Sequence, residues 1–165
     1  MKRTYMILAG VLACAASAAT VASAQPGTAT VASAQPGAPT AHAGRAAVVK
    51  LGKTQLGSIL VSSSGRTLYE FSRDHPKKSS CAAISGCPET WPALKTSGKP
   101  TAGAGVKASL LSSINLPGGG KQVSYAGHPL YLYSGDSGPR ETLYIGVKQF
   151  GGTWDALNAS GRAVK

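Results

Sequence analysis

The sequence predicts a small all-β domain, a sandwich or a barrel, made of two tandem and diverged β repeats. Short runs of β-branched and aromatic residues alternate with turn residues, and no run has the length of a long helix. The 165 residues include 21 glycines, which suit many tight turns between short strands. One aromatic motif also occurs twice, which indicates that the domain arose by duplication.

Residues 1–24 have the features of a signal peptide. Lys2 and Arg3 precede an apolar run from Met6 to Ala19, and Ala22-Ser23-Ala24 carries the small side chains of a cleavage site. A membrane anchor is the alternative, but this run is shorter than the ~20 apolar residues that span a bilayer. We therefore expect the protein to be exported.

Residues 25–45 are expected to form a disordered linker. Ala, Pro and Thr predominate there, and large apolar side chains are almost absent, so little burial can offset the entropy of ordering. The segment from Ala19 to Gly27 recurs unchanged from Ala29 to Gly37, so a second cleavage motif ends at Ala34. The signal peptide could therefore end at either of two places.

Cys14 follows Val11-Leu12-Ala13, which resembles a bacterial lipobox. In such a motif the cysteine is lipidated and becomes the new N-terminus. The alternative is that Cys14 is an ordinary apolar residue of the signal peptide. This choice decides whether the protein is secreted or anchored to the outer side of the cytoplasmic membrane.

The duplicated β domain is expected to comprise residues 46–165, with repeat one at about 46–104 and repeat two at about 105–165. Residues 106–114 could be a short helix or a strand. The segment from Asp74 to about Ala104 is rich in Pro, Gly and Ser and is expected to be irregular. The strands are expected near residues 48–51, 56–61, 66–72, 122–125, 129–134, 143–147 and 153–157.

The chain is strongly basic, with a formal charge of +11. Removal of Lys2 and Arg3 with the signal peptide leaves +9. Such a domain is attracted to anionic partners, so envelope polymers or another envelope protein are the expected partners. Lys77-Lys78 is the only adjacent basic pair after the signal peptide, so no specific nucleic-acid site is expected. Membrane contact is expected only through a lipid on Cys14.

Two cysteines remain in the mature part, Cys81 and Cys87. In an exported chain this pair is expected to close a disulfide, worth about 2 kcal/mol for so short a loop. Metal ligation or redox chemistry at these sulfurs is the alternative, but the chain has no second cysteine pair to complete a zinc site. We predict no metal site and no cofactor.

The repeated motif is G-x-x-L-Y-x-aromatic-S-x-D. It begins at Gly65 and again at Gly127, and a Trp follows each copy, 22 residues after Tyr69 and 23 residues after Tyr131. The two aromatic residues of each copy are two positions apart and so share one face of a strand, while the Leu points to the other face. Both faces are then apolar, as expected inside a sandwich.

Asp74 and Asp136 fall just after the expected strand ends. There an Asp side chain commonly accepts backbone N–H bonds in a turn, and ligand binding or catalysis is the alternative. The motif and its tryptophans supply the candidate binding residues. These are Tyr69, Phe71, Asp74, Trp91, Tyr131, Tyr133, Asp136 and Trp154.

The doubled Tyr-x-aromatic-x-x-Asp element, the Cys81-x5-Cys87 loop before Trp91-Pro92, and Gly127-His-Pro-Leu-Tyr131 carry a family resemblance. They resemble the bacterial secreted-repeat lipoproteins named for a Yx(FWY)xxD motif. The resemblance implies an exported or lipid-anchored protein, in a family without an established biochemical function. Relatives usually carry a Gly-Gln-Gly-like turn before the final Trp, whereas this chain has Glu141-Thr-Leu-Tyr-Ile-Gly146.

Three functions are compatible with these residues. The favoured one is a non-catalytic binding or structural module that uses exposed Tyr and Trp side chains at the strand ends. The second is a metal- or redox-cofactor protein that uses Asp74 with His75, or His128 with Asp136. The third is acid–base hydrolysis by Asp74 and Asp136, although no catalytic sequence motif is present. The loop from Asp74 to Trp91 is the first place to look for a site.

Overall fold

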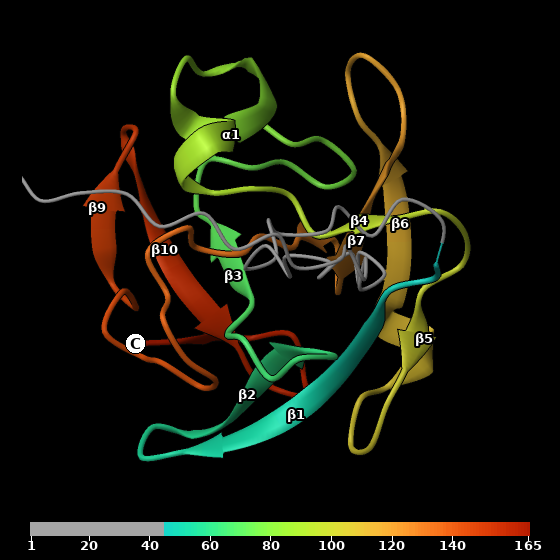
Figure 1. Ribbon diagram of the computed structural model, residues 1–165, viewed down its shortest axis with the longest axis vertical. Helices are drawn as coiled ribbons and strands as arrows, with labels where there is room; N and C mark the ends of the chain where they lie inside the picture. The colour runs from blue at the N-terminus through green and yellow to red at the C-terminus, as the bar shows by residue number, and fades with distance from the viewer. Residues whose placement is uncertain (1–44) are drawn as a thin grey trace, which may run out of the picture. The chain divides into compact units, whose positions relative to one another are not determined.

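The computed structural model describes residues 45–165, and Figure 1 shows that strands make up most of their regular secondary structure. The predicted signal peptide, Cys14 and nearly all of the predicted linker lie outside the described residues. The all-β prediction is confirmed, and the sheets are open and sandwich-like. None of the short helices in residues 45–165 has the length and apolar character needed to cross a membrane. The strands are β1 Val48–Thr54, β2 Gly57–Ser62, β3 Tyr69–Phe71, β4 Lys95–Thr96, β5 Thr101–Ala102, β6 Leu111–Asn115, β7 Lys121–Tyr125, β8 His128–Pro129, β9 Val147–Gln149, β10 Gly152–Leu157 and β11 Ala163–Val164.

Three short helical turns interrupt the strands. Two are 3₁₀ helices, η1 at Cys81–Ala83 and η2 at Ala108–Leu110, and one is an α-helix, α1 at Cys87–Thr90. The segment 106–114, which the sequence left open between helix and strand, contains both: η2 leads directly into β6.

The strands form three small sheets. In the first, β1 lies between β2, which is antiparallel, and β5, which is parallel. In the second, β10 pairs with β3, β9 and β11, and in the third, β7 pairs with β4, β6 and β8. Strands β3 and β4 belong to the first repeat, whereas β10 and β7 belong to the second. The two repeats are therefore interleaved in shared sheets and do not form separate lobes.

The β7–β8 hairpin turn forms at Ala126-Gly127, as the motif predicted. Both residues have positive φ, 50° and 89°, which matches the two-residue hairpin turn that follows the twist of its strands. Gly65, at the equivalent place, has φ of 87°, and the Ser62 N–H donates to the Arg66 carbonyl across that turn. Glycine suits these positions because side chains rarely adopt positive φ.

The strand expected at 66–72 is shortened to β3, and two other expected strands differ from the structure. Residues 143–147 form a turn up to Gly146, closed by a bond from Ile145 N–H to the Thr142 carbonyl, and only Val147 begins β9. Residues 129–134 are bonded on two sides by short stretches of chain, including Tyr69 and Pro92, and so do not form one continuous ladder. In both cases the hydrophobic pattern was strand-like, but the backbone bonds go elsewhere.

The core separates the two faces of the motif strands. The repeated Leu68 and Leu130 lie in an aliphatic cluster with Val49, Leu60, Leu111, Val123, Tyr125 and Leu157. The repeated aromatic residues lie in a second cluster with both cysteines and both tryptophans. The alternation read from the motif therefore matches the burial of the side chains.

Candidate functional site

The two copies of the motif meet at Tyr69 and Tyr131. These equivalent tyrosines form an antiparallel bridge in which each backbone N–H donates to the other's carbonyl at 2.9 Å. The two hydrogen bonds are reciprocal, so the bridge lies at a local twofold axis that relates the repeats. Each copy of the motif therefore lies beside the strand end of the other copy.

The tyrosine hydroxyls continue the exchange. The Tyr131 hydroxyl donates to Asp74 Oδ2 at 2.7 Å, and the Tyr69 hydroxyl donates to Asp136 Oδ1 at 3.3 Å. Each repeated Asp is thus bound by the Tyr of the other repeat. Burial raises the pKa of both tyrosines, and the neighbouring carboxylates raise it further, so both hydroxyls stay protonated as donors.

The two repeated tryptophans stack on one another. The Trp91 and Trp154 ring centroids are 4.0 Å apart, with 3° between the planes. Trp91 meets Tyr69 edge-on, and Trp154 meets Tyr131 edge-on, both at 5.1 Å. Each such aromatic pair contributes about 0.5–1.5 kcal/mol beyond its buried area.

Each outer face of the tryptophan stack is covered by an aromatic side chain of the other repeat. Phe71 of the first repeat stacks on Trp154 of the second at 4.2 Å, and Tyr133 of the second packs on Trp91 of the first at 4.5 Å. Tyr144 packs against Tyr133 at 3.9 Å. The aromatic residues of the motif therefore form one continuous core element.

The expectation that these aromatic side chains are exposed is wrong. Tyr69, Trp91 and Trp154 are 0% exposed, and Phe71 and Tyr131 are 1% exposed. Of the six predicted aromatic residues, Tyr133 alone remains partly exposed. The nearly equal spacing of the two Trp residues was the overlooked signal, because equivalent residues of a duplication can meet at its symmetry axis.

Asp74 closes the loop that precedes the disulfide. It accepts the Ser80 N–H at Oδ1 (2.6 Å) as well as the Tyr131 hydroxyl, and the Ser80 hydroxyl donates to the Arg73 carbonyl. Burial raises the pKa of Asp74, and these hydrogen bonds oppose that rise. The predicted disulfide follows directly and joins Cys81 to Cys87. Both sulfurs are buried in the aromatic cluster.

Asp136 occupies the equivalent position but lacks the equivalent loop. Its Oδ2 is buried without a hydrogen-bond partner among the described residues. Burial raises its pKa to about 6, and the nearby Arg66 guanidinium opposes the rise. The two repeated carboxylates therefore have different environments, because only the first copy carries a loop with donors for its Asp.

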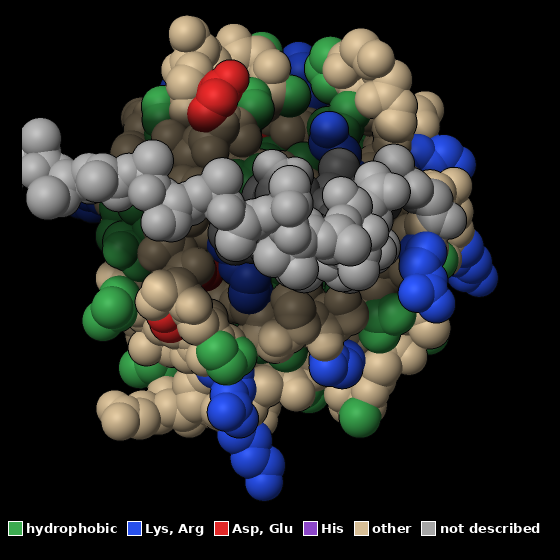
Figure 2. All heavy atoms as spheres, viewed as in Figure 1, with side chains coloured by type: hydrophobic (Ala, Val, Ile, Leu, Met, Phe, Trp, Pro, Cys, Tyr) green, Lys and Arg blue, Asp and Glu red, His purple; other side chains and the backbone are tan. Residues whose placement is uncertain are grey.

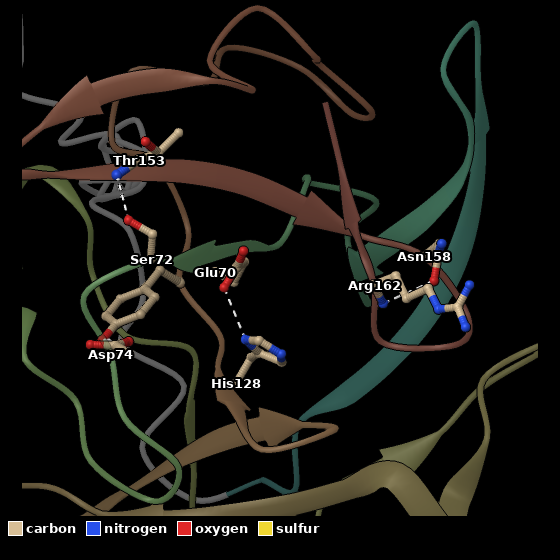
Figure 3. Close-up of polar contacts among 8 residues, drawn as sticks. Glu70, Ser72, Asp74, His128, Thr153, Asn158 and Arg162 are labelled. Carbon is tan, nitrogen blue, oxygen red and sulfur yellow. Dashed lines mark hydrogen bonds and ion pairs between the residues drawn. The ribbon is translucent and has the colours of Figure 1, made fainter.

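A second polar cluster was not predicted and lies on β3 and β10. Glu70 and Asp155 are directly opposite on these antiparallel strands, and both are buried. His128 Nδ1 lies 2.9 Å from Glu70 Oε2, and Figure 3 shows the two side chains facing each other. Burial is the largest cause that raises the pKa of Asp155, and the charge of Glu70 raises it further. The hydrogen bond to Glu70 raises the pKa of His128. The signal was Glu70 itself, a charge where the second copy has Leu132.

The histidines of the metal hypothesis do not share a setting. His75 is exposed, and its backbone forms an isolated β-bridge with Lys78, whereas the His128 side chain is bound to Glu70. Within residues 45–165 no group of three or more His, Cys, Asp or Glu side chains is arranged to hold a metal ion.

The larger of two surface grooves on the described residues follows β6 and β7. It has a volume of about 630 Å³, and its lining includes Ser112, Ser113 and Ser124 from these strands, with Lys77 and Lys121. A smaller groove of about 540 Å³ lies beside the β1–β2 turn and is lined by Lys53 and Arg140 among neutral residues. No acidic side chain lines either groove.

The surface is more basic than the net charge suggests, because most carboxylates are engaged. Glu70 and Asp155 are buried, Asp74 and Asp136 accept tyrosine hydroxyls, and Glu141 accepts the Ser137 hydroxyl. Among the described acidic residues only Glu89, on α1, is freely exposed. The exposed basic residues are Arg45, Lys53, Arg73, Lys77, Lys78, Lys95, Lys99, Lys107, Lys121, Arg140, Lys148, Arg162 and Lys165.

These exposed cations make no direct salt bridge. Within residues 45–165 the one pair that meets the distance of a salt bridge is His128 with Glu70. Among the described basic residues, the half-buried Arg66 lies near enough to Asp136 to influence its pKa. Figure 2 shows many blue side chains and few red ones on the face drawn, with blue ones gathered on the side where β5 and β6 lie.

Comparison with known proteins supports this reading of the repeats. The profile of a family described as a secreted repeat of unknown function matches residues 50–95 and again 112–158. Each match contains one copy of the motif together with the Trp that follows it. No curated protein and no solved structure matches the chain.

Proposed function

The chain belongs to the family of secreted repeats of unknown function, and from this premise we propose that it is a non-catalytic module that binds anionic polymers of the cell envelope. The protein is exported, so the phosphate- and carboxylate-bearing polymers of the envelope are within its reach. Lipid attachment at Cys14 stays a prediction, and the proposal holds for an anchored or a released domain.

The observation that carries this proposal is the separation of charge between the core and the surface. All the described carboxylates except Glu89 are used inside the fold or within local turns, whereas most of the described Lys and Arg side chains lie exposed without a salt bridge. Unpaired exposed cations attract polyanions over about a Debye length, roughly 8–10 Å at physiological salt. A polymer offers many anionic groups to cations that are spread over a surface.

The two grooves give the charge a place to act. Lys77 and Lys121 line the larger groove beside serine hydroxyls, and Lys53 and Arg140 line the smaller one. Hydroxyls donate to phosphate or carboxylate oxygens, and the cations strengthen such bonds. A non-catalytic role is favoured because Asp74 and Asp136 are both held by tyrosines of the opposite repeat.

Binding of polyphosphate and polygalacturonate, with dextran as the neutral control, tests the proposal. We expect both polyanions to bind, dextran not to bind, and affinity to fall as salt rises. Lys77→Glu/Lys121→Glu should weaken binding about tenfold more than Lys99→Glu/Lys148→Glu, which changes the charge equally outside the grooves.

Two results would count against the proposal. One is a polyanion affinity no greater than that for dextran at about 0.15 M salt. The other is an equal loss in the two charge-reversal variants, which would show that the grooves have no particular role.

A further inference from the structure

Strand β6 has an open edge. It pairs on one side with β7, from Leu111 opposite Tyr125 to Asn115 opposite Lys121, and no described strand pairs with its other side. All the residues of Ser112–Asn115 line the larger groove, so the groove runs along this strand. The open edge and the groove are therefore one surface.

The register shows which backbone groups point outward. The Ala126 N–H donates to the Leu110 carbonyl, and the Leu116 N–H donates to the Gly120 carbonyl. Continuing that alternation between them, Ser112 and Ile114 face β7, whereas Ser113 and Asn115 face away from it. Among the described residues, neither outward N–H has a hydrogen-bond partner. The edge thus offers donors spaced as a second extended strand requires.

The other strand edges are covered or short. The outer side of β2 is bonded by Leu68 N–H to the Leu60 carbonyl and by Ser62 N–H to the Arg66 carbonyl. Strands β4, β5 and β11 have two residues each, and β9 has three, with Lys148 in its centre. Short length and edge lysines are the usual protections against pairing with another chain.

Strand β6 carries none of these protections. It has five residues, Leu-Ser-Ser-Ile-Asn, without Lys, Pro or a bulge in its pairing with β7. Ser112 and Asn115 are exposed, and Ile114 is 6% exposed. An unprotected edge of this length is a template for strand addition.

The charge around the edge selects the partner. Lys77 and Lys121 line the same groove, and no acidic side chain does. We propose that the β6 edge accepts an extended acidic segment of another envelope protein as an added antiparallel or parallel strand. Main-chain bonds to Ser113 and Asn115 hold the segment, and acidic side chains on one of its faces meet the two lysines.

A second copy of this chain is a poorer occupant than an acidic segment. Joining two β6 edges brings the lysines of both copies toward one another, which is repulsive. The inference uses the exported location but does not depend on polymer binding, because it concerns main-chain hydrogen bonds that a polyanion does not make.

A short peptide of alternating Val and Glu is the probe, measured by isothermal titration and by amide chemical shifts. The control peptides alternate Val with Lys, or carry N-methyl groups on alternate Val-Glu amides. We expect binding of the acidic peptide, and at least about tenfold weaker binding of either control.

Variants at one position separate the backbone from the side chain. Ser113→Pro removes the outward N–H, and should weaken peptide binding about tenfold, whereas Ser113→Ala keeps the N–H and should change it less than about twofold. Both variants lack the Ser113 hydroxyl, so their polyphosphate affinities should equal one another, and a difference between them in peptide binding is distinguishable from a failure of polymer binding. Near-ultraviolet circular dichroism checks the fold.

Three results would overturn the proposal. If the wild-type protein binds the N-methylated peptide as tightly as the unmodified acidic peptide, the peptide is not added as a strand. If a folded Ser113→Pro variant binds the acidic peptide as tightly as the wild type, the outward N–H of residue 113 makes no bond to the peptide. Self-association that Ser113→Pro abolishes would assign the edge to a second copy.

Discussion

Trp91 and Trp154 are equivalent residues of the two repeats, and they stack face to face with their centroids 4.0 Å apart. Sixty-three residues of sequence separate them. Their contact means that neither repeat has a complete aromatic core of its own. The motif thus holds the two repeats together, and the binding surface that we propose lies elsewhere on the domain.

The stacked indoles are expected to give a coupled circular dichroism signal that needs both rings. Trp91→Phe and Trp154→Phe should each abolish the same band, and each should lower the free energy of unfolding by about 0.5–1.5 kcal/mol through the lost stacking. Spectra of the two variants and of the double variant check this. A band that survives in either single variant would contradict the stack.

The two cross-repeat tyrosine bonds are expected to differ in strength. Tyr131→Phe leaves Asp74 and Ser79 without a hydroxyl at 2.7 and 2.8 Å and should cost about 1–3 kcal/mol. Tyr69→Phe breaks a bond of 3.3 Å and should cost about 0.5–1 kcal/mol. Denaturant unfolding measures both values. The opposite order would show that Asp136 is held more tightly than Asp74.

Asp136 is expected to make stability depend on pH. Its folded pKa is raised from the ordinary 3.8 to about 6, so its contribution is fully present below about pH 4 and is lost as pH rises through 6. Asp136→Asn should therefore stabilise the domain at pH 7.5, by at most about 1 kcal/mol after solvent screening, and much less at pH 4. Unfolding at both pH values gives the comparison. Glu89→Gln, at an exposed carboxylate, serves as the control, and an equal pH effect in both variants would contradict the assignment.

His128 is expected to show a second dependence on pH. The Glu70 hydrogen bond raises its pKa, so the stabilisation is present below the ordinary value of 6.5 and is lost as pH rises through the higher folded pKa. His128→Gln should cost more stability at pH 5.5 than at pH 9. His75→Gln, at the exposed histidine, should change the free energy of unfolding very little at either pH. A His128→Gln cost that does not change with pH would show that the imidazolium–carboxylate pair adds nothing.

The disulfide is expected to stabilise the loop that Asp74 closes. Cys81→Ser/Cys87→Ser should lower the free energy of unfolding by about 2 kcal/mol from loop entropy, with a further loss from placing hydroxyls in an apolar cluster. Thermal unfolding of the oxidised, reduced and substituted proteins measures these losses. Thiol titration of the native protein should find neither Cys81 nor Cys87 free. A reduced protein as stable as the oxidised one would contradict this role.

The sequence was informative where local chemistry decides structure. The alternation of Leu68 with Tyr69 and Phe71 assigned the two faces of the segment 68–71 correctly, and Gly127 marked a real hairpin turn. The Cys81 to Cys87 spacing gave the disulfide. These are short-range features, which a strand period or a turn conformation determines directly.

Features that depend on how the repeats meet were missed. The motif suggested Trp91 and Trp154 as surface contacts, because nothing local shows that each is covered by the other repeat. Glu70 and Asp155 are 85 positions apart and become neighbours only through the pairing of β3 with β10. The register between distant strands is set by tertiary packing and cannot be read from either strand alone.

An amide chemical-shift map of the domain during titration with polyphosphate tests most directly whether the basic grooves bind polyanions. We expect shifts along β6 and β7 and around Lys77, with Lys53 and Arg140 as the second place of change. The stacked residues Trp91 and Trp154 should not shift. Shifts centred on the motif residues, or the absence of any localised shift, would contradict the assignment of binding to the basic grooves.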